Sequence, residues 1–163
     1  MKLFNQVMFN KPKLNKFDLS HEKKLTMRMG NLVPIFLQEI LPGDKFRVNT
    51  EILMRLQPML SPIYGRLRIQ VDYFFVPNRL VWDSWEEFIT GGEDGTSAPL
   101  FPLIRIGEAE KAEIAIKTLA DYMGIPTSTT TGHTNTIQFS ALPFRGYQTI
   151  FNEYYRDQNL IIS

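Results

Sequence analysis

The pattern of apolar and polar positions in the first half of the chain has a period of two. Apolar and polar side chains alternate in residues 46–51 and, most regularly, in residues 66–73. In the second segment Leu67, Ile69 and Val71 fall on one face, with polar side chains on the other. This period is typical of half-buried β-strands. We therefore predict strands here, the clearest at 66–73.

The second half of the chain favours helices. Apolar side chains recur at helical spacing in residues 108–123 and 143–156. A shorter helix is expected at about 83–90, because glutamates favour its first turn and Gly91 with Gly92 ends it. The whole pattern predicts strands joined by long connections that contain these inserted helices.

The chain divides into an arm and a domain. We predict that residues 1–30 form an extended, basic N-terminal arm and that residues 31–163 form the N-terminal portion of a single domain. Within that domain, residues 100–106 favour a short strand. The apolar residues at the end of the chain resemble the beginning of another strand, so we expect the sequence to cover part of a larger fold.

Charge separates the arm from the rest of the chain. Residues 1–30 carry seven basic and two acidic side chains, a net charge of +5, whereas the other residues have a net charge of −4. A basic arm on a mildly acidic body fits a polyanionic partner. The same charge also fits a solvated, mobile terminus, and charge alone leaves both interpretations open.

Signatures of catalysis are weak. The sequence has no cysteine, and its two histidines, His21 and His133, have no neighbours at metal-ligand spacing. Glu86 and Glu87 are adjacent, so their carboxylates do not converge on one point. No apolar run reaches the roughly 20 residues that span a bilayer. We expect no catalytic residues, no metal site, no cofactor and no membrane partner.

Aromatic side chains form two groups, one in residues 73–88 and one in residues 144–155. Three uses are open for them: a buried core, a contact between subunits, or stacking on bases of single-stranded nucleic acid. The first group is acidic on balance, which disfavours stacking on nucleic acid. The candidate subunit-interface residues are Trp82, Trp85, Phe144, Tyr147, Tyr154 and Tyr155.

Four long motifs make the chain similar to a known family. They are "LPGD", "YFFVPNRL", "FITGG" and "LPFRGYQ…YRDQN", in this order along the sequence. The chain resembles the N-terminal part of the major capsid protein of microviruses, small icosahedral phages with single-stranded DNA genomes, and within them the gokushovirus branch. Residues 93–137 match the family less well.

This resemblance implies a mainly β fold: a viral jelly roll of eight antiparallel strands with helical insertions, only partly covered by this chain. It implies a structural subunit, not an enzyme, that assembles through pentamers into a T=1 shell of sixty copies. The implied partners are other copies of the protein, the single-stranded DNA genome, a small basic internal DNA-binding protein and a scaffolding protein. The implied location is the virion, after assembly in the cytoplasm of a bacterial host.

In such a shell the arm would face the genome. Charge and position, not a family motif, then select the nucleic-acid-binding candidates: Lys11, Lys13 and Lys16, followed by Lys23, Lys24 and Arg28. Two other functions remain alternatives: a single-stranded nucleic-acid-binding protein and a carbohydrate-binding jelly-roll module.

Overall fold

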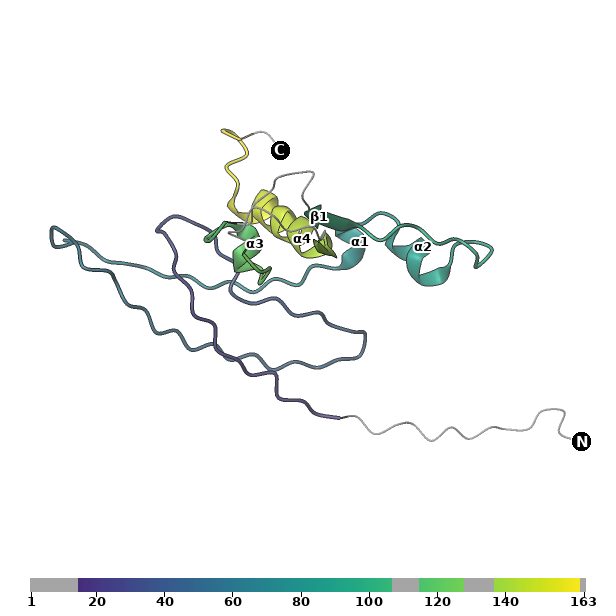
Figure 1. Ribbon diagram of the computed structural model, residues 1–163, viewed down its shortest axis with the longest axis horizontal. Helices are drawn as coiled ribbons and strands as arrows, with labels where there is room; N and C mark the ends of the chain where they lie inside the picture. Colours follow the sequence, from purple (N-terminus) through teal and green to yellow (C-terminus); the bar gives the residue numbers. More distant parts are fainter. Residues whose placement is uncertain (1–14, 107–114, 128–136, 162–163) are drawn as a thin grey trace, which may run out of the picture.

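Helices and a small sheet gather on one side of the molecule, and long extended segments run out from them (Figure 1). The computed structural model describes residues 15–106, 115–127 and 137–161. Its elements, in chain order, are α1 (Asn78–Val81), α2 (Trp85–Thr90), β1 (Leu103–Ile106), α3 (Leu119–Tyr122), β2 (Ile137–Ser140), α4 (Leu142–Ile150) and the π-helix η2 (Phe151–Tyr155).

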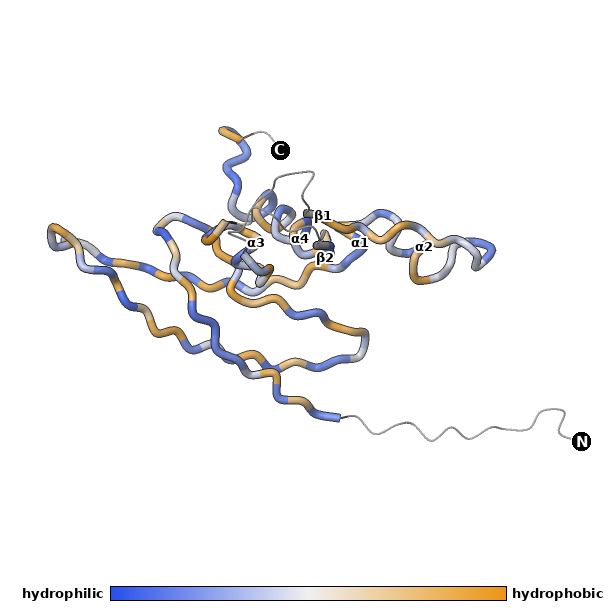
Figure 2. Tube along the Cα trace, viewed as in Figure 1, coloured by the Kyte–Doolittle hydropathy of each residue, from blue (hydrophilic) through white to orange (hydrophobic). Residues whose placement is uncertain are grey.

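Residues 15–77 contain no helix and no strand. The chain reverses direction at the turn around Gly43 and again near residues 60–65 (Figure 1). At the first reversal the backbone N–H of Asp44 donates to the Leu41 carbonyl at 3.1 Å, and Gly43 takes a φ of 92°, which glycine permits without strain. Apolar and polar residues alternate along these segments, as Figure 2 shows.

The prediction of a jelly roll is wrong for this structure. In the part of the chain that the structure describes, the only sheet has two antiparallel strands, β1 and β2, with Leu103 opposite Ser140. Within the described ranges, the segments predicted as strands, 46–51 and 66–73, form no β-ladder. A period of two shows which face of an extended segment is apolar, but a strand also needs a hydrogen-bonding neighbour. β1 confirms the short strand predicted within residues 100–106.

The residues at the two ends of α2 explain where the helix begins and ends. The helix begins after Ser84 and ends at Gly91, whose φ of 79° is left-handed. A Cβ at Gly91 would lie 2.9 Å from the backbone of Gly95, so only glycine fits this close approach. Two glutamates occupy the first turn, where their negative charges interact favourably with the positive end of the helix dipole.

The other helices are shorter or less regular than the sequence pattern suggests. Of the helix expected at 108–123, residues 107–114 lie outside the described residues, and α3 covers only Leu119–Tyr122. The Thr118 hydroxyl caps α3 by accepting from the backbone N–H of Asp121 at 3.4 Å. In the segment 143–156, α4 begins with a proline in its first turn and continues directly into η2.

The buried core is small and centres on the helices. Among the described apolar residues only Trp82, Tyr122 and Ala141 are buried. The Trp82 ring lies 5.0 Å from the ring of Phe88 and 5.4 Å from that of Phe101, centroid to centroid. Leu53, Leu60 and Leu100 are each at least 93% exposed. Much apolar surface is therefore left without cover.

Candidate subunit and nucleic-acid interfaces

Residues 23–34, which we call the arm root, are tied to the helices through backbone carbonyls. The Tyr122 hydroxyl donates to the Thr26 carbonyl at 2.7 Å, and the Tyr147 hydroxyl donates to the Leu32 carbonyl at 3.0 Å. Tyr122 lies in α3 and Tyr147 in α4, so two different helices hold the same segment. Burial raises the pKa of Tyr147 above its ordinary value.

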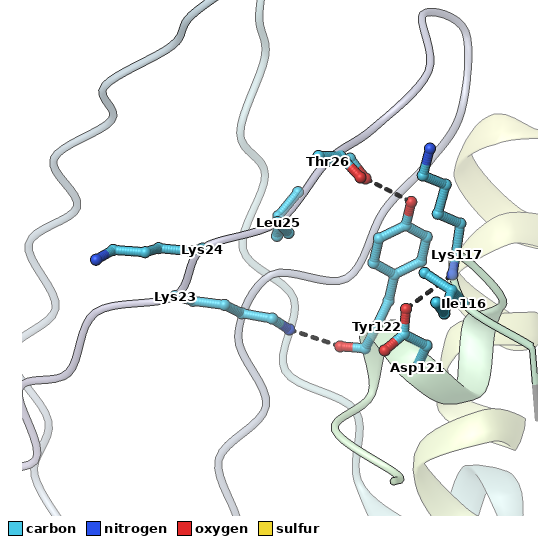
Figure 3. Close-up of a pocket in the computed structure, with 8 residues that line it drawn as sticks. All are labelled: Lys23, Lys24, Leu25, Thr26, Ile116, Lys117, Asp121 and Tyr122. Atoms are coloured by element: carbon cyan, nitrogen blue, oxygen red, sulfur yellow. Dashed lines mark hydrogen bonds between the residues drawn. The ribbon is translucent and has the colours of Figure 1, made fainter. Parts of the chain in front are cut away.

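Lys23 adds a third tie between the arm root and α3. Its ammonium donates to the carbonyl of Tyr122 at 2.6 Å and to that of Pro34 at 3.3 Å. Desolvation lowers the pKa of Lys23, and the nearby negative charge of Asp121 partly opposes this effect. Figure 3 shows Lys23 reaching the Tyr122 carbonyl while Lys24 points away from it, in an open pocket of about 390 Å³.

The structure separates the predicted nucleic-acid-binding residues by their surroundings. Lys16, Lys23, Lys24 and Arg28 are all exposed, and the Lys23 ammonium also donates to the two carbonyls. Lys24 lies 3.7 Å from Glu22, and both side chains are at least 80% exposed, so this ion pair is weak. Lys11 and Lys13 lie outside the described residues. Binding of nucleic acid by any of these residues stays a prediction.

The first aromatic group forms a cluster that is buried on one side. Trp82 is 7% exposed, and Trp85 is half-buried beside it, with ring centroids 6.0 Å apart. Phe88, one turn further along α2, lies 6.1 Å from Trp85 and remains 44% exposed. Trp82 therefore serves this chain's own core, whereas Trp85 and Phe88 are accessible.

The second aromatic group is divided in the same way. Phe144 is half-buried against Phe139 of β2, at 5.6 Å between ring centroids. Tyr147 is half-buried as well, since its hydroxyl holds the arm root. Tyr154 is 70% exposed and Tyr155 is 37% exposed, so the π-helix presents its tyrosines outward. A role of these residues in subunit contacts stays a prediction.

Tyr155 also ties η2 to the extended segment before α1. Its hydroxyl donates to Asp72 Oδ2 at 2.5 Å, and the side-chain amide of Gln70 donates to the same carboxylate at 2.9 Å. These hydrogen bonds, that of Tyr155 first, lower the pKa of Asp72, and the bond to Asp72 raises the pKa of Tyr155. The ring of Phe74 lies 4.9 Å from that of Tyr154, which adds an apolar contact beside this bond.

Sequence reasoning missed the tie between Tyr122 and the arm root. The pattern placed Tyr122 in a helix but gave no signal that its hydroxyl meets Thr26, 96 positions earlier in the chain. The contacts of Lys23 with the carbonyls of Tyr122 and Pro34 were missed as well, because charge does not reveal which carbonyls lie beside an ammonium. Neither contact could be found without the fold.

Within the described ranges, no group of three or more histidine, aspartate or glutamate side chains could hold a metal ion. No helix in this part of the chain has the length and hydropathy to cross a membrane.

Comparison with known proteins shows the class of protein to which the chain belongs. The chain matches the capsid protein (F protein) family over residues 6–163. It therefore belongs to this family of viral capsid proteins, which are structural and not enzymatic. No solved structure is significantly similar to it.

Three curated relatives carry the name "Capsid protein VP1". The chain is 38% identical to that of Chlamydia phage 1 over 165 residues and 40% identical to that of Bdellovibrio phage phiMH2K over 147 residues. These alignments cover 96% and 90% of the chain, and 26% of each relative. The protein of Spiroplasma virus 4 is 28% identical over 146 residues. The chain thus spans about a quarter of the length of its relatives.

These matches confirm the family that the sequence motifs suggested. They also confirm the expectation of a structural protein without catalysis.

We predict that Tyr122→Phe loosens the arm root without unfolding the helices. The variant loses one hydrogen bond worth about 1 kcal/mol, which corresponds to roughly fivefold more opening of this segment. Trypsin should then cleave after Lys24 and Arg28 about five times faster in the unassembled protein. Tyr64→Phe is the matched control, because Tyr64 is 96% exposed. Equal cleavage rates in the two variants would show that the tie does not restrain the segment.

We predict that Tyr155→Phe raises the pKa of Asp72 toward its ordinary value of 3.8, part of the way because Gln70 still donates. The folded pKa of Asp72 is depressed, so its stabilising effect is present above the ordinary pKa and is lost as the pH falls through the depressed one. Titration of the Asp72 carboxylate carbon by NMR measures the change. Tyr154→Phe, one residue away and 70% exposed, should leave the titration unchanged; the same shift in both variants would contradict the assignment.

Proposed function

We propose that the protein carrying this chain is the structural subunit of a T=1 icosahedral capsid that encloses a single-stranded DNA genome. Sixty copies assemble through pentamers, and the product is located in the virion. The observation that carries this proposal is the match to the capsid protein family over residues 6–163. Similarity to the VP1 capsid proteins of three small phages supports it.

The uncovered apolar surface supports assembly. Leu53, Leu60 and Leu100 are each at least 93% exposed, and many other large apolar side chains are more than 40% exposed. Soluble monomers rarely leave extensive contiguous apolar surface in water, because covering it lowers the free energy by about 25 cal/mol per Å². In a capsid subunit, neighbouring copies and other parts of the same protein supply such cover.

The accessible aromatic side chains are the proposed anchors between subunits. Trp85, Phe144, Tyr154 and Tyr155 offer large contact areas at low entropic cost, as interface residues commonly do. Trp82 and Tyr147 contribute indirectly, since their contacts within the chain hold these anchors in place.

The basic arm is proposed to face the genome. Lys16, Lys24 and Arg28 are exposed on its described part, where they neutralise phosphates without reading sequence. Lys11 and Lys13 extend the same charge toward the N-terminus. A small basic internal protein shares this neutralisation, and a scaffolding protein guides assembly in the cytoplasm of the bacterial host.

Sedimentation velocity tests the proposed function. The protein carrying this sequence, expressed in full with its scaffolding protein, should sediment as pentamers and closed shells. A stable monomer under these conditions would refute the capsid proposal. A monomer that binds single-stranded DNA tightly would instead favour the nucleic-acid-binding alternative, and one that binds glycans would favour the carbohydrate-binding alternative.

We predict that replacing Lys16, Lys24 and Arg28 by Gln weakens the salt dependence of binding to single-stranded DNA. Each phosphate contact contributes a slope of about −0.7 to log K against log salt, so the slope should become less negative by about 2. The control replaces Arg79, Arg105 and Lys117, which are exposed outside the arm, and should leave the slope unchanged. Equal slopes in the two triple variants would remove the arm from the genome contact.

A further inference from the structure

Helix α2 and the loop after it present an apolar face that nothing in the described chain covers. We call residues 82–101 the α2 end. Its inner side packs Trp82 against Phe101, but Ile89 is 62% exposed and Leu100 is 93% exposed. Phe88 bridges the two sides, since its ring touches the Trp82 cluster and stays 44% exposed. This is an aromatic-backed surface of the kind that anchors protein contacts.

The charge around this apolar face has one sign. The α2 end has five acidic side chains and no basic one, and all five carboxylates are exposed. Within the described ranges, none of them forms an ion pair. A partner for this surface should therefore be apolar at its centre and basic around it. The acidic side chains are Asp83, Glu86, Glu87, Glu93 and Asp94.

A surface with this description exists elsewhere in the same chain. Residues 55–68, which we call the basic tip, contain three arginines and no acidic residue. Every residue of the tip is exposed, including the apolar Leu60 and Tyr64. None of its arginines has an ion-pair partner among the described residues. Pro58 and Pro62 restrict its backbone, which reduces the entropy lost when it docks.

The two surfaces cannot meet within one copy. In Figure 1 the bend of the basic tip lies at the far left of the molecule, and α2 with its loop lies toward the right, along the longest axis. A contact between them therefore joins two copies head to tail. Such a heterologous contact, repeated around a rotation axis, closes a ring in which every copy uses both of its surfaces.

We propose that the α2 end of one copy docks on the basic tip of a second copy. This inference rests on the proposed function, because it requires that copies assemble. Ile89, Leu100 and Phe88 of one copy cover Leu60 and Tyr64 of the other. The apolar side chains supply the affinity, and the opposite charges select the orientation and accelerate the encounter. Because the charges are exposed, salt screens their part of the contact.

Charge reversal tests this pairing in the complete protein. Glu86, Glu93 and Asp94 are exposed, and their side chains form no hydrogen bond within the described ranges, so replacing all three by Lys alters charge with little effect on the local fold. This triple variant changes the net charge of the α2 end from −5 to +1, and replacing Arg55, Arg66 and Arg68 by Glu changes that of the basic tip from +3 to −3. Each triple variant should reduce the association constant of subunits at low salt by about tenfold or more, because it places like charges together.

The variant with all six substitutions decides the outcome. It restores opposite net charges, +1 on the α2 end and −3 on the tip, so it should associate at least about threefold more strongly than either triple variant. Recovery would not occur if either triple variant had only damaged the fold. Replacing Glu39, Glu51 and Glu153 by Lys is the matched control, since it makes the same charge change at exposed positions outside both surfaces and should assemble normally.

Three results would overturn the pairing. One is normal assembly of both triple variants, and another is failure of the sixfold variant to recover. The third is an Arg55→Glu, Arg66→Glu, Arg68→Glu protein that assembles normally but loses binding to single-stranded DNA, which would assign the basic tip to the genome. Failure of the unmodified protein to assemble would instead refute the capsid proposal itself, so the two failures can be told apart.

Discussion

Three tyrosine hydroxyls connect the extended half of the molecule to its helical half. Tyr122, Tyr147 and Tyr155 lie in α3, α4 and η2, and each donates one hydrogen bond to residues 26, 32 and 72 in turn. Their acceptors are two backbone carbonyls and one carboxylate, in segments with no regular structure of their own. The extended segments have no β-ladder to position them. These three hydrogen bonds, together with those of Lys23, hold the segments against the helices.

The same segments explain why so little of the chain is buried. Residues 46–51 and 66–73 expose both their apolar faces and their unpaired backbone groups. Such edges are available for pairing with any other chain, which is a hazard in an isolated monomer and an advantage in a protein that assembles. Trp82, Tyr122 and Ala141 are the buried apolar residues of the described chain, and all three lie in or beside the helices. The stability of the rest depends on what covers it.

The sequence predicted correctly those features that depend on residues within a few positions of one another. The glycine after α2, the proline at the start of α4 and the apolar residues of β1 each determine structure within a few positions. The alternation in 66–73 was also real, as Figure 2 shows, but it did not determine a strand, since pairing depends on a partner distant in sequence. Contacts such as that of Tyr122 with Thr26 were out of reach for the same reason. Sequence motifs identified the family, whereas the long-range contacts were found only in the structure.

The way the arm root is held has a consequence for how it can vary. Thr26, Leu32 and Pro34 take part through their carbonyl oxygens, which every amino acid possesses. Most side chains of the arm root therefore do not hold the segment in place. The hydrogen bonds that hold it are donated by Lys23, Tyr122 and Tyr147. The chemistry of this segment can then change from one sequence to another, while the three donors keep the path of its backbone constant.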